Sequence, residues 1–363
     1  MRMDSFAFII HPIDPKRDVG RKFPLLGHVL NERQIDFFST YFPPVYISEI
    51  EGIVSAVTGK EIRGWFIACP YTPRRMLALP ERTVYRKIVQ TGRMAERLGA
   101  NILGLGAFTS VVGDAGQTIA DRLQVPVTTG DSYTVALAVQ AIREAGRLMD
   151  IAIKDATVAV VGATGAIGRV CAELLAGEAA RLLLVARDPS QLEALRDRLS
   201  TGARAELLVS TGMAALSEAQ LILTVTSSLH DVIHPEDLLP GSVVCDVARP
   251  RDVSAMVAGV RDDILVIDGG MADVPGPVDF HFNFGFPPGK AYACMAETMA
   301  LALEGRFEDY TVGREITLDR VREITAIAEK HGFRLSGFRS FEREVTEGQI
   351  EAVRRNAKAR RRP

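Results

Sequence analysis

Short apolar runs alternate with helical patterns through the second half of the chain. The runs lie at residues 158–161, 182–186, 221–225, 243–247 and 265–267. Continuous apolar runs are typical of strands buried on both faces, and strands that alternate with helices form parallel sheets. The pattern therefore predicts a doubly wound parallel sheet of the Rossmann type, covered by helices on both faces.

The first 130 residues show a mixed pattern. Strands are predicted at residues 6–10, 45–50, 53–57, 62–69, 102–105 and 124–129. The turn at residues 58–60 has the sequence Thr-Gly-Lys, a hairpin signal, so a β-meander is predicted between residues 45 and 69. Asn31 is suited to cap the start of a helix, and Gly99 is suited to end the helix predicted over residues 81–98. These elements predict a mixed α/β domain.

Further helices join and follow the two predicted sheets. One covers residues 131–149, and after the Pro-Pro-Gly break at 287–289 three more are predicted over residues 291–303, 318–331 and 341–357. The prediction is an α/β chain of two domains, with C-terminal helices that pack back onto the first. The predicted divisions are an N-terminal substrate and catalytic domain at 1–134, a linker helix at 135–154, the Rossmann domain at 155–288 and C-terminal helices at 289–363.

Composition argues against several classes of protein. The chain has 43 Lys and Arg against 45 Asp and Glu, so its net charge of -2 gives no overall attraction to nucleic acid. It has no apolar run near the roughly 18 residues of a membrane helix, and we expect a cytoplasmic protein without an integral membrane segment. The four cysteines form no C-x-x-C pair and the six histidines show no metal-ligand spacing, so neither disulfides nor a metal site are predicted.

A glycine turn marks a cofactor site. The residues TVAVVGATGAIGRVCAELL form an apolar strand, a turn and a helix in the order that dinucleotide binding requires. Gly162 permits the tight turn, Gly168 lets strand and helix pack closely, and the helix N-terminus faces the pyrophosphate. Arg187 ends the next apolar run, where an acidic residue would favour NAD, so the predicted cofactor is NADPH. The predicted cofactor-binding residues are Gly162, Thr164, Gly165, Ile167, Gly168, Arg187, Thr226, Ser227 and Gly269.

Cys294 is the candidate nucleophile. It follows the Pro-Pro-Gly break and is predicted in the first turns of a helix, where the dipole favours a thiolate. If that helix includes Lys290, then Lys290, Cys294 and Glu297 share one face, and these three are the predicted catalytic residues. Lys290 would lower the pKa of the thiol, whereas Glu297 would raise it or transfer a proton. Spacing alone fits a buried structural cysteine equally well, which is the expectation for Cys171 and Cys245.

A resemblance to a known family favours the nucleophile. Six motifs carry it, namely LGLGAFTS at 103–110, VPVTTGDSYT at 125–134, VAVVGATGAIG at 158–168, LLLVARD at 182–188, VIDGG at 266–270 and AYACMAETM at 291–299. In this order they resemble the long-chain fatty acyl-[acyl-carrier-protein] reductases of cyanobacteria, which form aldehydes. The segment 11–22, the basic C-terminal tail and the Pro- and Gly-rich stretch 274–288 depart from that pattern, and they leave acyl chain length and carrier open.

The resemblance implies that NADPH reduces a long-chain fatty acyl thioester, carried by acyl carrier protein or CoA, to a fatty aldehyde. It assigns the nucleophile to Cys294 of the A-C-x-A-E motif. The expected scheme is that the thiolate expels the carrier thiol, forms an acyl-enzyme and releases aldehyde after hydride transfer. Backbone N–H groups at 104–110 and 129–132 are candidate oxyanion donors. The predicted substrate residues are Gly106, Phe108, Ser110 and Ser132.

A carrier protein is acidic, so a basic docking surface is expected. One candidate is the tail at residues 354–362. The other consists of Arg74, Arg75, Arg82, Arg86, Lys87, Arg93 and Arg97. An enzyme that consumes the aldehyde is a further expected partner.

Two other classes of function remain open. A shikimate-type or glutamyl-tRNA-reductase-like NADP dehydrogenase would share the two-domain layout. However, the first domain shows no Lys/Asp pair suited to a hydroxy acid, and binding to tRNA calls for a more basic chain. The other alternative is a protein that senses NADPH without catalysis.

Overall fold

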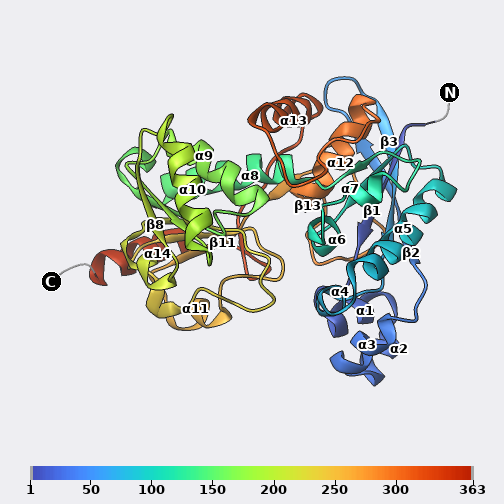
Figure 1. Cartoon of the computed structure of the whole chain (residues 1–363), viewed down its shortest axis with the longest axis horizontal. Helices are drawn as coiled ribbons and strands as arrows, with labels where there is room; N and C mark the ends of the chain where they lie inside the picture. Colours follow the sequence, from blue (N-terminus) through green and yellow to red (C-terminus); the bar gives the residue numbers. More distant parts are fainter. Residues whose placement is uncertain (1–2, 361–363) are drawn as a thin grey trace. The chain divides into compact units, whose positions relative to one another are not determined.

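The computed structural model describes residues 3–360 and divides into two compact units (Figure 1). The first unit consists of Met1–Tyr133 with Ala272–Arg334, and the second of Thr134–Met271 with Leu335–Pro363. The residues predicted as a C-terminal region, 289–363, therefore form no region of their own. Those up to Arg334 belong to the first unit, and those from Leu335 belong to the second.

The first unit is built on a five-stranded sheet. Its strands are β1 (Ser5–Ile10), β2 (Val45–Val54), β3 (Glu61–Ala68), β4 (Ile102–Leu105) and β5 (Val127–Thr128), in the order β2-β3-β1-β4-β5. Only β2 runs antiparallel to its neighbour, so β1, β3, β4 and β5 all end at one edge. The loops that follow these strands are therefore brought together there.

The predicted β-meander is wrong, because β2 is one continuous strand through residues 45–54 and pairs with β3 as a single hairpin. The register shifts between Ile50 and Ile53, where Gly52 adopts a φ of +74°. A Cβ atom on Gly52 would lie 2.4 Å from the carbonyl oxygen of Pro277. Glycine at this position therefore makes a bulge that admits a neighbouring segment, and not a turn.

Helices cover this sheet and its edges. They are α1 (Pro15–Lys22), α2 (Pro24–Val29), α3 (Glu32–Ser39), α4 (Pro73–Ala78), α5 (Glu81–Leu98), α6 (Phe108–Val111), α7 (Gln117–Ala120), α12 (Ala293–Glu304) and α13 (Leu318–His331). Asn31 caps α3 and Gly99 ends α5, as predicted. The helix α12 packs on β1, β3 and β4, and its residues 295–303 are all buried. A Cβ atom on Gly104 would lie 2.2 Å from Oγ1 of Thr298, so glycine in β4 allows this close packing.

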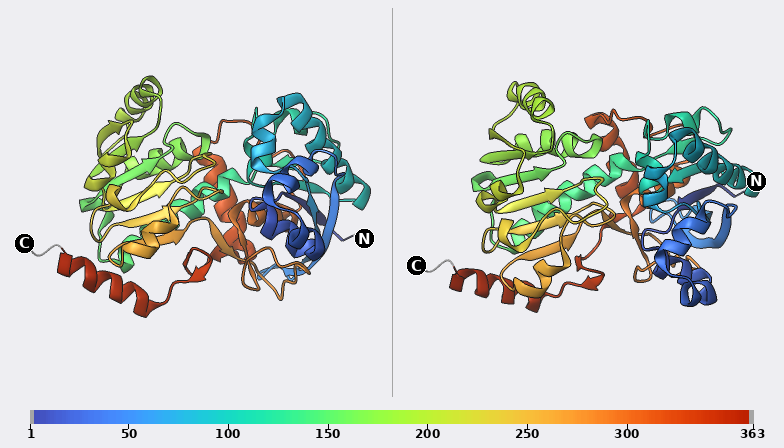
Figure 2. Two further views of the ribbon diagram at one scale, coloured as in Figure 1. Left: turned by 90° about the horizontal axis from the view of Figure 1, so that it is seen from below. Right: turned by 60° about the horizontal axis from the view of Figure 1, so that its bottom comes forward.

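The second unit contains the predicted Rossmann sheet. Its strands are β6 (Thr157–Val161), β7 (Arg181–Val185), β8 (Glu206–Ser210), β9 (Leu221–Thr224), β10 (Val243–Asp246) and β11 (Leu265–Asp268). All six are parallel, in the order β11-β10-β9-β6-β7-β8, and they lie side by side in both views of Figure 2. This is the 3-2-1-4-5-6 order of dinucleotide-binding folds, with the switch point between β6 and β9.

No apolar run of the sequence corresponds to β8, the edge strand next to β7, because each residue of β8 is at least partly exposed. The helices of this unit are α9 (Ala166–Ala176), α10 (Pro189–Ser200) and α11 (Ala255–Val260), while α8 (Asp131–Leu148) starts in the first unit and continues into the second. Smaller elements are the 3-10 helices Ile153–Asp155, Met213–Glu218 and Pro235–Asp237 and the strands β12 (Met271–Asp273), β13 (Lys290–Tyr292) and β14 (Arg334–Leu335).

The last predicted helix begins later than expected. A short hairpin of β15 (Arg339–Ser340) and β16 (Arg343–Glu344) precedes α14 (Glu347–Arg360). Its turn residues Phe341 and Glu342 have φ values of +46° and +69°, which end the helical pattern read from the sequence. Within residues 3–360, no helix combines the length and the apolar character that a bilayer crossing requires.

Candidate functional site

The candidate nucleophile lies at the strand-end edge of the first sheet. Cys294 is the second residue of α12, so its predicted place in the first turn of a helix is confirmed. Gly130 in the loop after β5 has a φ of +77°, and a Cβ atom on it would lie 2.2 Å from the Cα atom of Cys294. The backbone of this loop therefore packs directly on the nucleophile, an approach that only glycine permits.

The thiol of Cys294 is not activated in the way that the dipole argument predicted. Burial raises its pKa to about 12, and the nearby carboxyl groups of Asp131 and Glu297 act in the same direction. Cys294 is also the only one of the four cysteines that is partly exposed, since Cys69, Cys171 and Cys245 are buried. The residue is therefore partly exposed while its thiol is protonated, and the thiol needs a proton acceptor to attack a substrate.

Lys290 does not share a helix face with Cys294, so this prediction is wrong. The helix begins at Ala293, whereas Lys290 belongs to the strand β13. Its ammonium group lies 2.7 Å from the carboxylate of Asp273. An i-4 relation brings side chains together only inside a helix, and here the helix starts too late.

Glu297 is fully buried one turn after Cys294. One carboxylate oxygen accepts hydrogen bonds from the hydroxyl groups of Thr128 and Thr311, and the other accepts one from the backbone N–H of Tyr133 at 2.8 Å. Burial raises the pKa of Glu297, while these donors favour its ionised form. The carboxyl group thus joins β5, the start of α8 and the segment around Thr311 to α12.

Ser132 belongs to the same network. Its hydroxyl group lies 2.9 Å from Oγ1 of Thr311, which in turn donates to Glu297, and the residue is fully buried. The side chain of Ser132 is thus already engaged, and its backbone N–H is the group that remains to contact a substrate.

Asp131 is a site residue that the sequence reasoning missed. It is the first residue of α8 and only 6% exposed. Burial raises the pKa of its carboxyl group to about 7, and the nearby Glu297 adds to this rise. A carboxyl group that titrates near neutrality beside a cysteine is a candidate proton acceptor. The available signal was the sequence Gly130-Asp131 between a strand and a helix, but acids at helix starts are common for electrostatic reasons.

The loop after β4 holds the other predicted substrate residues. The backbone N–H groups of Gly106, Thr109 and Ser110 donate to carbonyl oxygens of neighbouring residues. The N–H of Phe108 donates to Nε2 of the buried His11 at 3.0 Å. Burial lowers the pKa of His11 to about 4, so this ring is neutral and accepts the hydrogen bond. These four N–H groups are therefore occupied. The N–H groups of Thr129 and Gly130 also donate, to Thr311 and Thr128, so those of Asp131 and Ser132 at the start of α8 are the better candidate oxyanion donors.

The glycine turn of the second unit fits a dinucleotide. Gly162 follows β6 with a φ of +82°, and a Cβ atom on it would lie 2.8 Å from the carbonyl oxygen of Val225. A Cβ atom on Gly168 would lie 2.1 Å from the carbonyl oxygen of Gly162. Gly165 precedes α9, and no side chain caps the first N–H groups of that helix. The helix N-terminus is therefore open to a phosphate group, next to the switch point of the sheet.

The other predicted cofactor residues lie at strand ends of the same sheet. Arg187 follows β7 and is exposed, as is Ser227 after β9. The backbone N–H and the hydroxyl group of Thr226 both donate hydrogen bonds to the carboxylate of Asp252. Gly269 is buried, and a Cβ atom on it would lie 2.7 Å from the sulfur of Cys245. Gly269 is thus required for packing, while Arg187 and Ser227 remain open to a ligand.

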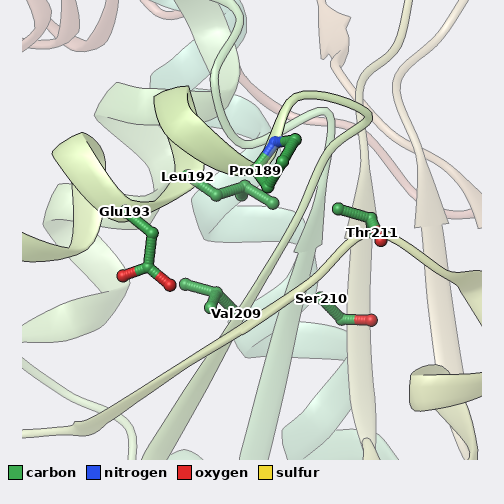
Figure 3. Close-up of a pocket in the computed structure, with 6 residues that line it drawn as sticks. All are labelled: Pro189, Leu192, Glu193, Val209, Ser210 and Thr211. Carbon is green, nitrogen blue, oxygen red and sulfur yellow. The ribbon is translucent and has the colours of Figure 1, made fainter.

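A hollow of about 340 Å³ lies beside the ends of β7 and β8 (Figure 3). Its lining residues are Pro189, Leu192, Glu193, Val209, Ser210 and Thr211. The lining combines apolar and hydroxyl side chains with the carboxylate of Glu193 and contains no cation, so it suits a flat uncharged group better than a phosphate. Arg187 precedes Pro189 by two residues and is the nearest cation along the chain. No group of three or more His, Cys, Asp or Glu side chains in residues 3–360 is placed to hold a metal ion.

One family model matches the cofactor unit. The family model described as shikimate/quinate 5-dehydrogenase matches residues 143–268. L-Tryptophan dehydrogenase from Nostoc punctiforme is a solved structure with 15% identity that covers 99% of this chain and 87% of its own, with a TM-score of 0.39. The matched residues of the family model lie in the second unit and do not include Cys294.

Two curated relatives match almost the whole chain. The aminotransferase PigE of Serratia sp. is 32% identical over 97% of this chain, but the chain spans only 42% of its length. The long-chain acyl-[acyl-carrier-protein] reductase of Synechococcus elongatus is 31% identical over 90% of this chain and 98% of its own. Both matches extend through the first unit as well as the second.

Proposed function

The chain belongs to the family of long-chain acyl-[acyl-carrier-protein] reductases and is an oxidoreductase that uses a nicotinamide cofactor, and from this premise we propose that it reduces a long-chain fatty acyl thioester to a fatty aldehyde with NADPH. The observation that carries the proposal is the environment of Cys294. The partly exposed Cys294 lies with its Cα and Cβ atoms against Gly130, and the carboxyl groups of Asp131 and Glu297 are close by. This arrangement suits thioester exchange, in which a cysteine takes an acyl group from another thiol.

In the proposed first step, Cys294 attacks the thioester carbonyl as its proton passes to the carboxylate of Asp131. The acyl carbon forms a bond to the cysteine sulfur, and its bond to the carrier sulfur breaks. The departing carrier thiolate takes the proton back from Asp131, so the acyl-enzyme forms without net loss of a proton. Because burial raises the pKa of Asp131 to about 7, its carboxyl group can both accept and return a proton near neutral pH.

The start of α8 would stabilise the charge that develops on the carbonyl oxygen. Asp131 and Ser132 are its first two residues, and their N–H groups belong to the first turn of an 18-residue helix. They follow Gly130, which contacts Cys294 directly. Backbone donors fixed by a helix need no reorganisation during the reaction, which makes them effective at such a site. Glu297 would keep this turn in place through the N–H of Tyr133.

The glycine turn and the start of α9 would hold the pyrophosphate of NADPH. The hollow beside α10 would accept the adenine ring, and Arg187 the 2′-phosphate. When bound, NADPH supplies the hydride that converts the acyl group to an aldehyde. Release of the aldehyde breaks the bond between the acyl carbon and the cysteine sulfur, and the thiolate takes up one proton from solvent, which returns Cys294 to its thiol form.

Charge reversal at Arg187 tests the preference for NADPH. The variant Arg187→Glu is expected to raise the KM for NADPH at least tenfold while changing the KM for NADH about twofold or less, because only NADPH carries the 2′-phosphate. Steady-state kinetics with each cofactor measure this. Arg198→Glu, an exposed arginine of α10 with the same charge change, is the matched control. An unchanged ratio of the two KM values in Arg187→Glu would contradict the assignment.

Trapping of the acyl-enzyme tests the function itself. Incubation of the protein with a long-chain acyl-CoA in the absence of NADPH is expected to add the mass of one acyl group, and peptide mapping should place it on Cys294. NADPH added afterwards should release aldehyde and restore the original mass. Reduction of NADP by an alcohol substrate without any adduct would instead favour a shikimate-type dehydrogenase, and cofactor binding without turnover would favour an NADPH sensor.

A further inference from the structure

Four arginines form a stripe along α5, as two pairs spaced four residues apart. Arg82, Arg86, Arg93 and Arg97 are all exposed. At 100° per residue their positions fall within an arc of about 60°, and they extend over about 22 Å of the helix. The buried residues of α5 lie on the opposite side of the helix and pack in the first unit, which leaves the stripe facing outward. We call these four residues the α5 stripe.

The α5 stripe has no counter-ions on the part of the chain that the structure describes. Among residues 3–360, no carboxylate lies within ion-pair distance of any of its four guanidinium groups, although the chain has more acidic than basic residues. Like charges that line up on one helix face repel each other, so the stripe weakens the isolated helix. An unpaired row of four cations is therefore better explained by an anionic partner than by stability.

Four other cations of the two predicted docking surfaces are already engaged, whereas Arg74, Arg355 and Lys358 have no ion pair among the described residues. Arg75 pairs with Asp36 at 2.6 Å, and the ammonium group of Lys87 donates to the carbonyl oxygen of Phe42. In α14, Arg354 pairs with Asp150, and Arg360 pairs with Asp262 and Asp263. Arg361 and Arg362 of the predicted tail lie outside the described residues. Of the two predicted surfaces, α5 thus presents the larger unpaired positive charge.

The position of α5 in the fold links the stripe to the site. The helix follows β3 and α4 and precedes β4, so its first turn lies toward the edge at which β1, β3, β4 and β5 end. Tyr85, on its buried side, accepts a hydrogen bond from the N–H of Asp114 at 2.9 Å, in the segment that follows α6. The Arg82 end of the stripe is therefore the end nearer to the Cys294 edge of the sheet, and the Arg97 end is farther away.

We propose that the α5 stripe is the docking surface for the acidic carrier protein that presents the acyl thioester to Cys294, with Arg82 and Arg86 nearest to the carrier's thioester arm. The inference rests on the proposed function. A row of cations over about 22 Å matches one acidic helix of a partner in both charge and length. Exposed charges at such a surface accelerate and orient association, so their loss raises KM more than it lowers the rate of the bound complex.

The test compares one acyl chain on two carriers, the acyl carrier protein and the uncharged thiol N-acetylcysteamine. The variant Arg82→Glu/Arg86→Glu is expected to lower kcat/KM for the acyl-carrier protein at least tenfold, mainly through KM, and to change kcat/KM for the small thioester less than twofold. The wild-type rate with the carrier protein should fall steeply with added salt, while that of the variant should not. The milder Arg82→Gln/Arg86→Gln variant should show the same selectivity with a smaller loss.

The matched control is Arg355→Glu/Lys358→Glu, which makes the same change of net charge at two exposed residues of α14. Its kcat/KM for the carrier substrate should stay within twofold of wild type. The proposal is overturned if the α5 variants keep full activity on the carrier substrate, if they lose both substrates equally, or if the α14 variant loses more. If the wild type converts neither thioester, the proposed function fails. The docking surface can then be tested separately by measuring the binding of fluorescently labelled holo-carrier protein. Binding that is weakened by the α5 changes and not by the α14 changes would support the docking surface. Binding that the α5 changes leave unaffected would overturn it.

Discussion

Replacement of Cys294 by alanine is expected to abolish aldehyde formation, with kcat reduced by at least about 10³-fold, because the attacking sulfur is removed. Alanine is smaller than cysteine and retains the Cβ atom that packs against Gly130, so the loop after β5 and the first turn of α12 should keep their positions. Serine would keep a hydroxyl group at the same place, but its much weaker acidity makes it a poor nucleophile here, and Cys294→Ser should be equally inactive. Aldehyde production measured with a long-chain acyl-CoA checks both variants.

Cofactor binding separates the chemical effect from a loss of structure. The glycine turn lies in the second unit and Cys294 in the first, so both variants are expected to bind NADPH with the affinity of the wild type. Fluorescence titration with NADPH measures this directly. Cys69→Ala, which alters a fully buried cysteine of the same unit, is the control for the loss of a thiol and should keep its activity if it folds. A Cys294→Ala protein that still forms aldehyde at the wild-type rate would refute the acyl-enzyme scheme.

The Rossmann unit could be predicted from the sequence because its signals are local. The five apolar runs correspond to the five strands with mostly buried residues, and the glycine turn lies between β6 and α9. The edge strand β8 was missed because it buries little surface, and residues 45–50 and 53–57 were predicted as two strands where one continuous strand, β2, bulges at Gly52. In both cases tertiary contacts decide the outcome, and the local pattern does not contain them.

The candidate site was harder to predict, because its electrostatics depend on burial and on residues distant in the sequence. Cys294 was found from its helix start and from a motif. Its pKa is raised first by burial and then by the carboxyl group of Asp131, which lies more than 160 residues earlier in the sequence. Lys290 was misplaced because the start of α12 could be predicted only within a few residues. Asp131 was overlooked because an acid at a helix start needs no functional explanation.

Replacement of Asp131 by asparagine is expected to have two opposite effects on Cys294. Loss of a nearby negative charge lowers the pKa of the thiol, so alkylation of Cys294 by iodoacetamide at pH 8 should become faster. Aldehyde formation should nevertheless fall by about 10²- to 10⁴-fold, because the group that accepts the proton during attack is lost. The wild-type kcat should rise with pH through an inflection near the Asp131 pKa of about 7, and this inflection should be absent from the variant.

Stability provides the remaining control for Asp131→Asn. Because the folded-state pKa of Asp131 is raised above its unfolded value, its contribution to the free energy of unfolding is present below about pH 4 and is lost as the pH rises through about 7. Asparagine cannot ionise, so the variant should not be less stable than the wild type above pH 7, which urea unfolding at pH 8 can measure. Asp121→Asn, at an exposed carboxylate of the same unit, should change neither alkylation nor turnover. If Asp131→Asn instead slowed alkylation and turnover together, Asp131 would act by holding the thiol in place, and its role as proton acceptor would be refuted.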